Sequence, residues 1–232
     1  MLPSNRQALS DGLRDGIPIG LGYFVVSFSL GIVAQYVGLT PIEGFITSFL
    51  NNASAGEYAA FTVISADAPY LEMAVITLVA NARYLLMSAV LSQKFDPATP
   101  FYHRIFVGFD VTDEIFGITV ARPGKLNPYY NYGAMSVALP GWSIGTMMGV
   151  VAGNVLPPAT VSALSVALYG MFLAIIMPPA RSDRVILIAV LVSFAMSFLA
   201  KEFFGDISAG TRTIILTVLI AGVAAYIRPI KN

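Results

Sequence analysis

Charged residues and cysteine are scarce in this 232-residue sequence, and each scarcity excludes a class of protein or site. Only 11% of the residues are charged, less than half of the share of about 25% that is usual in soluble domains. Cysteine is absent and His103 is the only histidine, which excludes disulfides, thiolate nucleophiles and ordinary Cys/His metal sites, so no metal or other cofactor is expected. The formal net charge is +0, which leaves no basic surplus to bind nucleic acid.

Apolar residues are abundant instead. They make up 56% of the chain, and the mean hydropathy is +0.75. This composition predicts a multi-pass protein of the cell membrane, with one domain over residues 1–232. The first residues, "MLPSNRQALSDGLRDG", are polar and do not resemble a cleavable signal peptide, so we expect the N-terminus to be retained.

Several stretches are long and apolar enough, or nearly so, to cross a bilayer as helices, which takes about 20 residues. They are residues 16–39, 70–92, 131–155, 161–179, 185–200 and 211–227. Residues 44–66 and 105–120 carry polar groups instead, which are tolerated at membrane depth where protein or a wet cavity covers them. We therefore predict an all-α transmembrane helix bundle of about six full spans and two broken or re-entrant segments; eight full crossings is the alternative.

The basic residues favour the re-entrant arrangement, because lysine and arginine of short loops gather on the cytoplasmic side. If both polar segments return to the face that they entered, only Lys201 and Arg212 of the loop residues lie outside, and both termini are cytoplasmic. Two full crossings would instead place Lys94 and Arg104 outside. The two hairpins would enter from opposite faces, and "AAFTVISA" (59–66) weakly echoes "FGITVA" (116–121), as in the inverted repeats of many transporters.

The stretch "GWSIGTMMGVVAG", residues 141–153, fits two patterns. Its G-x-S-x-G around Ser143 is typical of the nucleophile elbow of serine hydrolases, but that elbow needs a strand, a turn, a helix and a base. The only histidine lies in a charged loop and no lysine lies inside an apolar segment, so we do not expect an enzyme. Glycines at four-residue spacing also form a stripe for close helix packing, which we favour for Gly141, Gly145, Gly149 and Gly153.

The stretch "DVTDEIFG" places three carboxylates close together in an apolar segment. On one helix Asp110, Asp113 and Glu114 would share a face, where crowding and burial favour protonation of at least one of them. Charges at membrane depth cost about 2.5 to 3.5 kcal/mol each on insertion scales, so we expect these acids to carry a proton or to hold a substrate ammonium. The alternative is an interfacial segment with solvated acids.

Two further polar groups interrupt apolar runs. In "NNASAGEYAAF", amides, Ser54 and Glu57 accompany small residues, a combination that suits unwound backbone around a small zwitterion; the alternative is a polar extracellular loop. In "NARYLLMS", Arg83 either pairs with a buried acid such as Glu57 or Asp113, or offers its fork to a carboxylate ligand. The predicted substrate-binding or proton-coupling residues are Asn52, Ser54, Glu57, Asn81, Arg83, Asp110, Asp113 and Glu114.

Four short motifs in order, "ASAGEYA", "NARYLL", "TDEIFG" and "WSIGTMMG", resemble the azaleucine-resistance (AzlC) family of branched-chain amino acid permeases. The resemblance extends from "DGIPIGLGY" to at least Pro158. It implies a secondary carrier that exports branched-chain amino acids with a separate small membrane subunit of the AzlD type. The sequence departs from the family pattern at Glu57, where glutamine is expected.

These observations together predict a secondary transporter for a small zwitterion with an apolar side chain. The resemblance indicates valine, leucine or isoleucine as substrates, exported with proton or potential coupling. No nucleotide-binding motif occurs in the sequence. The alternative is a non-transporting membrane subunit or an intramembrane enzyme.

Overall fold

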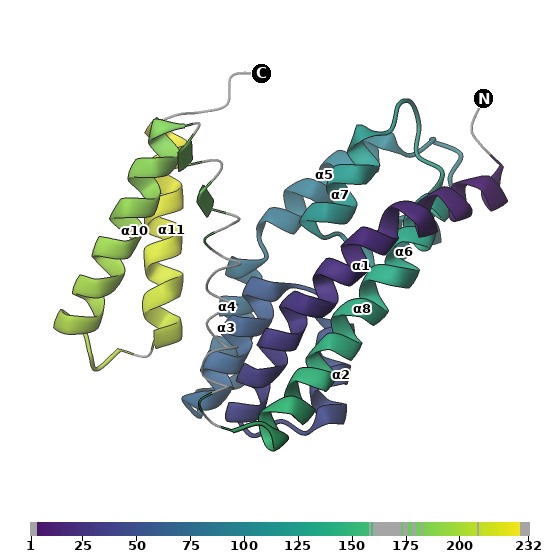
Figure 1. The fold of residues 1–232 in the computed structure, drawn as a ribbon. Coiled ribbons are helices and arrows are strands. Elements are labelled where there is room, and N and C mark those ends of the chain that lie inside the picture. Colours follow the sequence, from purple (N-terminus) through teal and green to yellow (C-terminus); the bar gives the residue numbers. More distant parts are fainter. Residues whose placement is uncertain are drawn as a thin grey trace.

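The fold is a bundle of helices in a computed structural model that describes residues 4–157, 183–207 and 209–227, and a few single positions between 158 and 182. This bears out the all-α class within these residues (Figure 1). The helices are α1 (Asn5–Tyr36), α2 (Pro41–Leu50), α3 (Ser54–Ser65), α4 (Tyr70–Ala80), α5 (Arg83–Lys94), α6 (Phe101–Phe109), α7 (Asp113–Ala121), α8 (Pro128–Val155), α10 (Arg184–Phe203) and α11 (Ala209–Ile227).

Within the described ranges, three helices, α1, α8 and α10, are long and apolar enough to cross a membrane. Helices α4 and α5 qualify only as a pair, bent by 51° at their junction, whereas the sequence predicted one span over 70–92. The expected stretch 161–179 lies mostly outside the described residues. The number of full crossings therefore stays a prediction.

Helix α1 begins at Asn5, well before the apolar stretch that was expected to start at residue 16. Ser4 caps it, accepting a hydrogen bond from the backbone N–H of Gln7, and so satisfies one of the free donors of the first turn. The polar turns that follow are held by Arg122, which pairs with Asp11 at 2.9 Å and with Asp15 at 3.5 Å. Contacts outside the apolar stretch thus extend the helix.

Helices α1 and α8 lie side by side and run in the same direction (Figure 1). Small residues let the two backbones touch. A Cβ added at Gly16 would lie 2.8 Å from the Cα of Ala134, and one added at Gly153 would lie 3.1 Å from the Gln35 side chain. Cβ atoms at the remaining three glycines of the predicted stripe would overlap the α1 side of the pair: Gly141, Gly145 and Gly149.

Helices α2 and α3 form a hairpin broken at residues 51–53. A capping box between Thr40 and Glu43 starts α2. The outer ends of both helices lie at the C-terminal ends of α1 and α8: Gly44 of α2 approaches Val150, and Phe61 of α3 joins the core cluster with Val150. The segment 44–66 therefore turns back on itself.

Helices α6 and α7 form a second hairpin, broken at residues 110–112. Both of its outer ends lie at the end of α5. Arg104 donates from Nη1 to the Ser92 carbonyl at 3.0 Å, and Lys94 donates from Nζ to the Val120 carbonyl at 2.7 Å. A core cluster containing Leu91, Val107 and Tyr130 lies at this end, toward the N-terminal ends of α1 and α8. The two hairpins thus enter from opposite ends of the α1–α8 pair.

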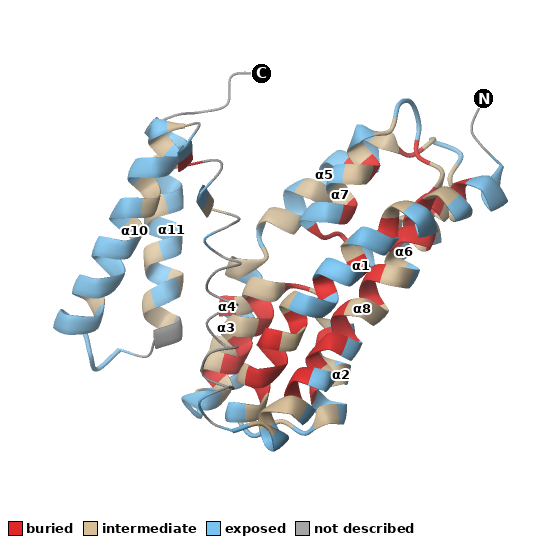
Figure 2. Cartoon of the chain, viewed as in Figure 1, coloured by how far each residue is buried: buried red, intermediate tan, exposed pale blue. Residues whose placement is uncertain are grey.

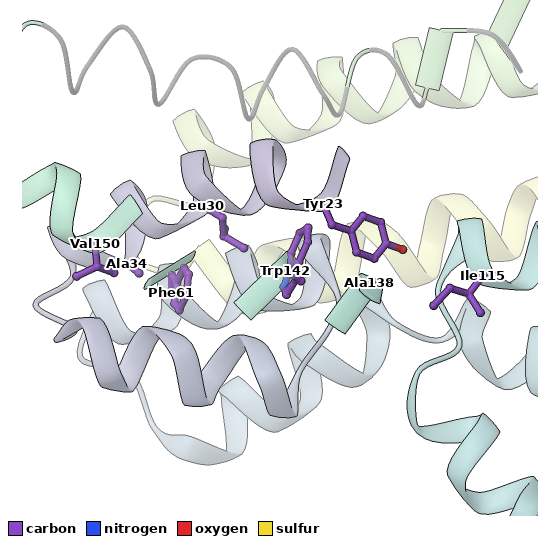
Figure 3. Close-up of a cluster of buried hydrophobic side chains, with 8 residues drawn as sticks. All are labelled: Tyr23, Leu30, Ala34, Phe61, Ile115, Ala138, Trp142 and Val150. Atoms are coloured by element: carbon purple, nitrogen blue, oxygen red, sulfur yellow. The ribbon is translucent and has the colours of Figure 1, made fainter. Parts of the chain in front are cut away.

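Burial is concentrated in α1, α3 and α8, whereas α10 contains no buried residue (Figure 2). A buried cluster of eight side chains joins α1, α3, α7 and α8 (Figure 3). Helix α11 contacts α4, and the Thr211 N–H donates to Oε1 of Glu72 at 3.0 Å. The hairpins and the α1–α8 pair therefore form the packed centre of the described structure.

Candidate functional site

The tips of the two hairpins meet. Asn52, in the break between α2 and α3, donates from Nδ2 to Oδ1 of Asp110, which follows α6 directly. The bend between α4 and α5 lies at the same place, because the Asn81 amide occupies the space where Gly56 lacks a side chain. Three interruptions of helical structure, from distant parts of the sequence, therefore converge.

A cavity of about 450 Å³ lies at this meeting point. Its volume falls within the range of about 300 to 1,000 Å³ that is usual for small-molecule sites. One wall is apolar and comes from α1 and α8; the other is polar and comes from the hairpins and α5. The lining residues are Pro18, Ile19, Gly22, Tyr23, Val26, Asn52, Ser54, Tyr84, Thr112, Asp113, Glu114 and Trp142. A larger hollow of about 750 Å³ lies at the loop after α7, away from the helix breaks.

Each acid of the "DVTDEIFG" segment has its own partner. Asp113 forms a bidentate ion pair with Arg83. Nη2 of Arg83 donates to Oδ2 at 2.9 Å, and Nε donates to Oδ1 at 3.2 Å. Glu114 accepts a hydrogen bond from the Tyr23 hydroxyl at 2.6 Å. Asp110 is 2% exposed, and its Oδ2 is buried without a partner among the described residues.

The prediction that Asp110, Asp113 and Glu114 share one helix face is wrong. Asp110 lies in the break, and α7 begins only at Asp113. The Thr112 side chain accepts from the Ile115 N–H and caps α7 there, which starts a new helix. The carboxylates are consequently distributed among Asn52, Arg83 and Tyr23 rather than crowded.

Glu57 lies on α3 behind the cavity and is completely buried. Its Oε2 accepts from the Trp142 indole N–H at 2.8 Å, and its Oε1 contacts the Ser48 hydroxyl. Ser48 in turn contacts the Thr146 hydroxyl at 2.6 Å. Trp142 separates Glu57 from the cavity and meets Tyr23 edge to face, with ring centroids 5.4 Å apart (Figure 3).

The remaining predicted polar residues are placed as follows. Ser54, the first residue of α3, lines the cavity. Asn81 contacts Gly56 and keeps a buried, unpaired Oδ1 among the described residues. Of the two acids considered for Arg83, the structure pairs it with Asp113 and not with Glu57.

Ser143 is buried inside α8, and its hydroxyl donates to the Leu139 carbonyl one turn earlier at 2.9 Å. Its surroundings are helical from Pro128 to Val155, unlike the strand-to-helix turn of a nucleophile elbow. His103 contacts the Tyr132 hydroxyl at 2.6 Å. Among the residues that the structure describes, no group of three or more His, Asp or Glu side chains is placed to hold a metal ion.

Several site residues escaped the sequence analysis. Tyrosine, serine and threonine are common in apolar helices, so residue type alone did not distinguish these positions. They are Tyr23, Ser48, Tyr84, Thr112, Trp142 and Thr146. Signals were present nonetheless: Trp142 is the only tryptophan in the chain, and Thr112, Trp142 and Thr146 lie in the motifs "TDEIFG" and "WSIGTMMG".

Comparisons with known proteins agree on one family. A family model described as AzlC protein matches residues 18–156. An uncharacterized membrane protein of Archaeoglobus fulgidus is 28% identical over 176 residues, which cover 75% of this chain and 77% of the relative. Inner membrane protein YgaZ of Escherichia coli K12 is 24% identical over 174 residues, covering 72% and 71%. No solved structure matches. This chain is therefore a membrane protein that belongs to the AzlC family.

Proposed function

We propose that this chain is the large subunit of a secondary transporter that exports valine, leucine, isoleucine or similar small zwitterions. The observation that carries the proposal is the cavity where the tips of two oppositely entering hairpins meet. Secondary carriers bind substrate at such breaks near the bilayer midplane, where helix ends offer free backbone groups.

The cavity suits a zwitterion with an apolar side chain. Glu114 on its wall offers negative charge to an ammonium group, and Asp110, whose Oδ2 is buried without a partner among the described residues, contacts Asn52 of the same wall. The start of α3 has no side-chain cap, so its backbone N–H groups and the Ser54 hydroxyl suit a carboxylate. Ile19 and Val26 of α1 supply an apolar surface for the side chain.

Arg83 serves this site indirectly. Its guanidinium group neutralises Asp113. Without it, the neighbouring residues Asp113 and Glu114 would place two negative charges side by side. An alternative role is direct: if Asp113 moves away, the guanidinium group of Arg83 can bind the substrate carboxylate instead. Both roles require the planar guanidinium.

The proposed complex includes a small AzlD-like membrane subunit and lies in the cell membrane with both termini in the cytoplasm. The family resemblance supports the partner, and the distribution of basic residues supports the orientation.

A single cysteine at Gln93 or Thr99 tests the orientation in a chain that has no cysteine of its own. We expect both to be protected from impermeant thiol reagents applied outside; strong outside labelling would favour eight crossings.

Transport in proteoliposomes tests the function. We expect labelled leucine, valine and isoleucine to leave vesicles that contain the chain and its small partner, with saturation and mutual competition. Unlabelled lysine or aspartate should compete weakly, because the apolar wall offers no partner to the charge on their side chains. Absence of movement with the partner present would favour the non-transporting subunit instead.

A further inference from the structure

The two hairpins carry a glutamate at corresponding positions. Glu57 precedes Thr62 by the same spacing as Glu114 precedes Thr119, and valine follows each threonine. The hydroxyls of Thr62 and Thr119 each donate to a carbonyl four residues earlier, at 3.0 Å and 2.6 Å. The weak sequence similarity between the two hairpins therefore extends to the hydrogen bonds of these threonines.

Each glutamate holds one member of an aromatic pair. Glu57 accepts from the Trp142 indole at 2.8 Å, and Glu114 accepts from the Tyr23 hydroxyl at 2.6 Å. Tyr23 and Trp142 meet edge to face on the cavity wall (Figure 3). A continuous chain of contacts thus runs from Glu57, through both rings, to Glu114.

We propose that Glu57 is the proton-binding site of the transporter and that it acts on the substrate cavity through Trp142; this inference rests on the proposed function. Glu57 is completely buried, and among the described residues it forms no ion pair. An isolated carboxylate in such a place costs several kcal/mol. A neutral carboxyl group needs only hydrogen bonds.

The hydroxyl chain beside Glu57 satisfies both protonation states. When Glu57 carries a proton, its O–H donates to Ser48, Ser48 donates to Thr146, and Thr146 donates to the Trp142 carbonyl, which lies 3.3 Å away. When Glu57 is ionised, the hydroxyl hydrogens reverse, so that Thr146 donates to Ser48 and Ser48 donates to Glu57. Hydroxyl rotation alone allows this, because each group both donates and accepts.

Among the described residues, other titratable groups are linked to Glu57 through the aromatic pair. Helix α2 offers Ser48 and helix α8 offers Thr146 and Trp142, none of which is charged. Tyr23 and Glu114 follow on the cavity side of Trp142. Loss of the proton strengthens the bond from the indole to the new carboxylate, and Trp142 transmits this change to the cavity wall.

Intrinsic fluorescence tests the proton site without any transport, since Trp142 is the only tryptophan. In purified protein, we expect its emission to change in a single step as the pH is varied over the range in which the protein stays folded. Glu57→Gln should abolish the titration, because its amide reproduces only the proton-loaded arrangement. Glu114→Gln, which alters the other end of the chain of contacts, should keep it. A flat wild-type profile, or an unchanged titration in Glu57→Gln, would overturn the proposal.

Binding and transport of labelled leucine provide a second test. Coupling between two sites typically changes affinity by about 5- to 150-fold and is reciprocal, so we expect leucine affinity to depend on pH in wild type and to lose that dependence in Glu57→Gln. Exchange of leucine for leucine should persist in this variant, while transport driven by a pH gradient is lost. Gradient-driven transport that equals wild type in Glu57→Gln would overturn the proton site but leave the transporter intact. If wild type moves no leucine, the function fails and fluorescence alone decides the proton site.

Discussion

The two hairpins share one architecture but treat their glutamates differently. In α2–α3, Glu57 is enclosed completely, and its hydrogen-bond donors among the described residues are the uncharged Ser48 and Trp142. In α6–α7, Glu114 is exposed to the cavity, and its neighbour Asp113 is paired with Arg83. An enclosed carboxyl group suits a proton, which needs no space, whereas an open one suits a substrate ammonium. The difference teaches that a repeated element can supply two ligand sites of distinct chemistry.

The α1–α8 pair is the frame on which both glutamates are anchored, through Tyr23 and Trp142, so breaking this pair has the largest expected effect. A leucine at Gly149 would overlap the Phe28 carbonyl region of α1. Overpacking usually costs about 1 to 3 kcal/mol, and backbone contact raises this. We expect Gly149→Leu to abolish folded protein, measured as monodisperse yield in detergent. The matched control is Gly222→Leu on α11, where no atom of the described residues lies within 4 Å of the missing Cβ; equal loss in both would contradict close packing of α1 on α8.

The hairpins themselves should differ in their tolerance of a larger side chain. Gly56 of α3 contacts the Asn81 amide, whereas the missing Cβ of Gly117 on α7 would have no neighbour within 4 Å in the part of the chain that the structure describes. We expect Gly56→Leu to lower the stability by about 1 to 3 kcal/mol and Gly117→Leu to leave it nearly unchanged. Thermal unfolding of the purified variants measures this. Equal destabilisation would mean that the two hairpins are packed alike.

Arg83→Lys sharpens the difference between the neighbouring acids Asp113 and Glu114. The lysine ammonium keeps the charge but cannot reproduce the two-pronged bond to Asp113. We expect leucine efflux to fall about tenfold, the equivalent of about 1.4 kcal/mol, with little change in expression. Normal efflux at matched expression would show that charge alone is sufficient at this position.

Ser143→Ala should have the smallest effect. The Ser143 hydroxyl donates to the Leu139 carbonyl within α8, and such a bond to the preceding turn contributes little to a helix. We expect stability to change by less than about 1 kcal/mol and leucine efflux to be retained. Loss of activity in a well-folded Ser143→Ala protein would restore the serine-hydrolase hypothesis.

Sequence predicted the hairpins because polar residues interrupt their apolar runs, and such interruptions have a direct cost in a membrane. It did not predict the bend at Asn81, since one amide among apolar residues also fits a straight helix. It did not predict the roles of Tyr23 and Trp142 either. Their roles arise from contacts between α1, α3, α7 and α8, and a local pattern contains no information on such contacts.

The central claim is that the cavity between the hairpin tips binds branched-chain amino acids, and protection of a cysteine at Ser54 tests it most directly. Ser54 lines the cavity, whereas Ser65 lies exposed at the other end of the same helix and supplies the control. With no native cysteine, each single variant reports one position. We predict that leucine slows the reaction of Ser54→Cys with a small thiol reagent and leaves Ser65→Cys unaffected. An unchanged rate at Ser54→Cys in saturating leucine, in protein that still exports leucine, would contradict the account.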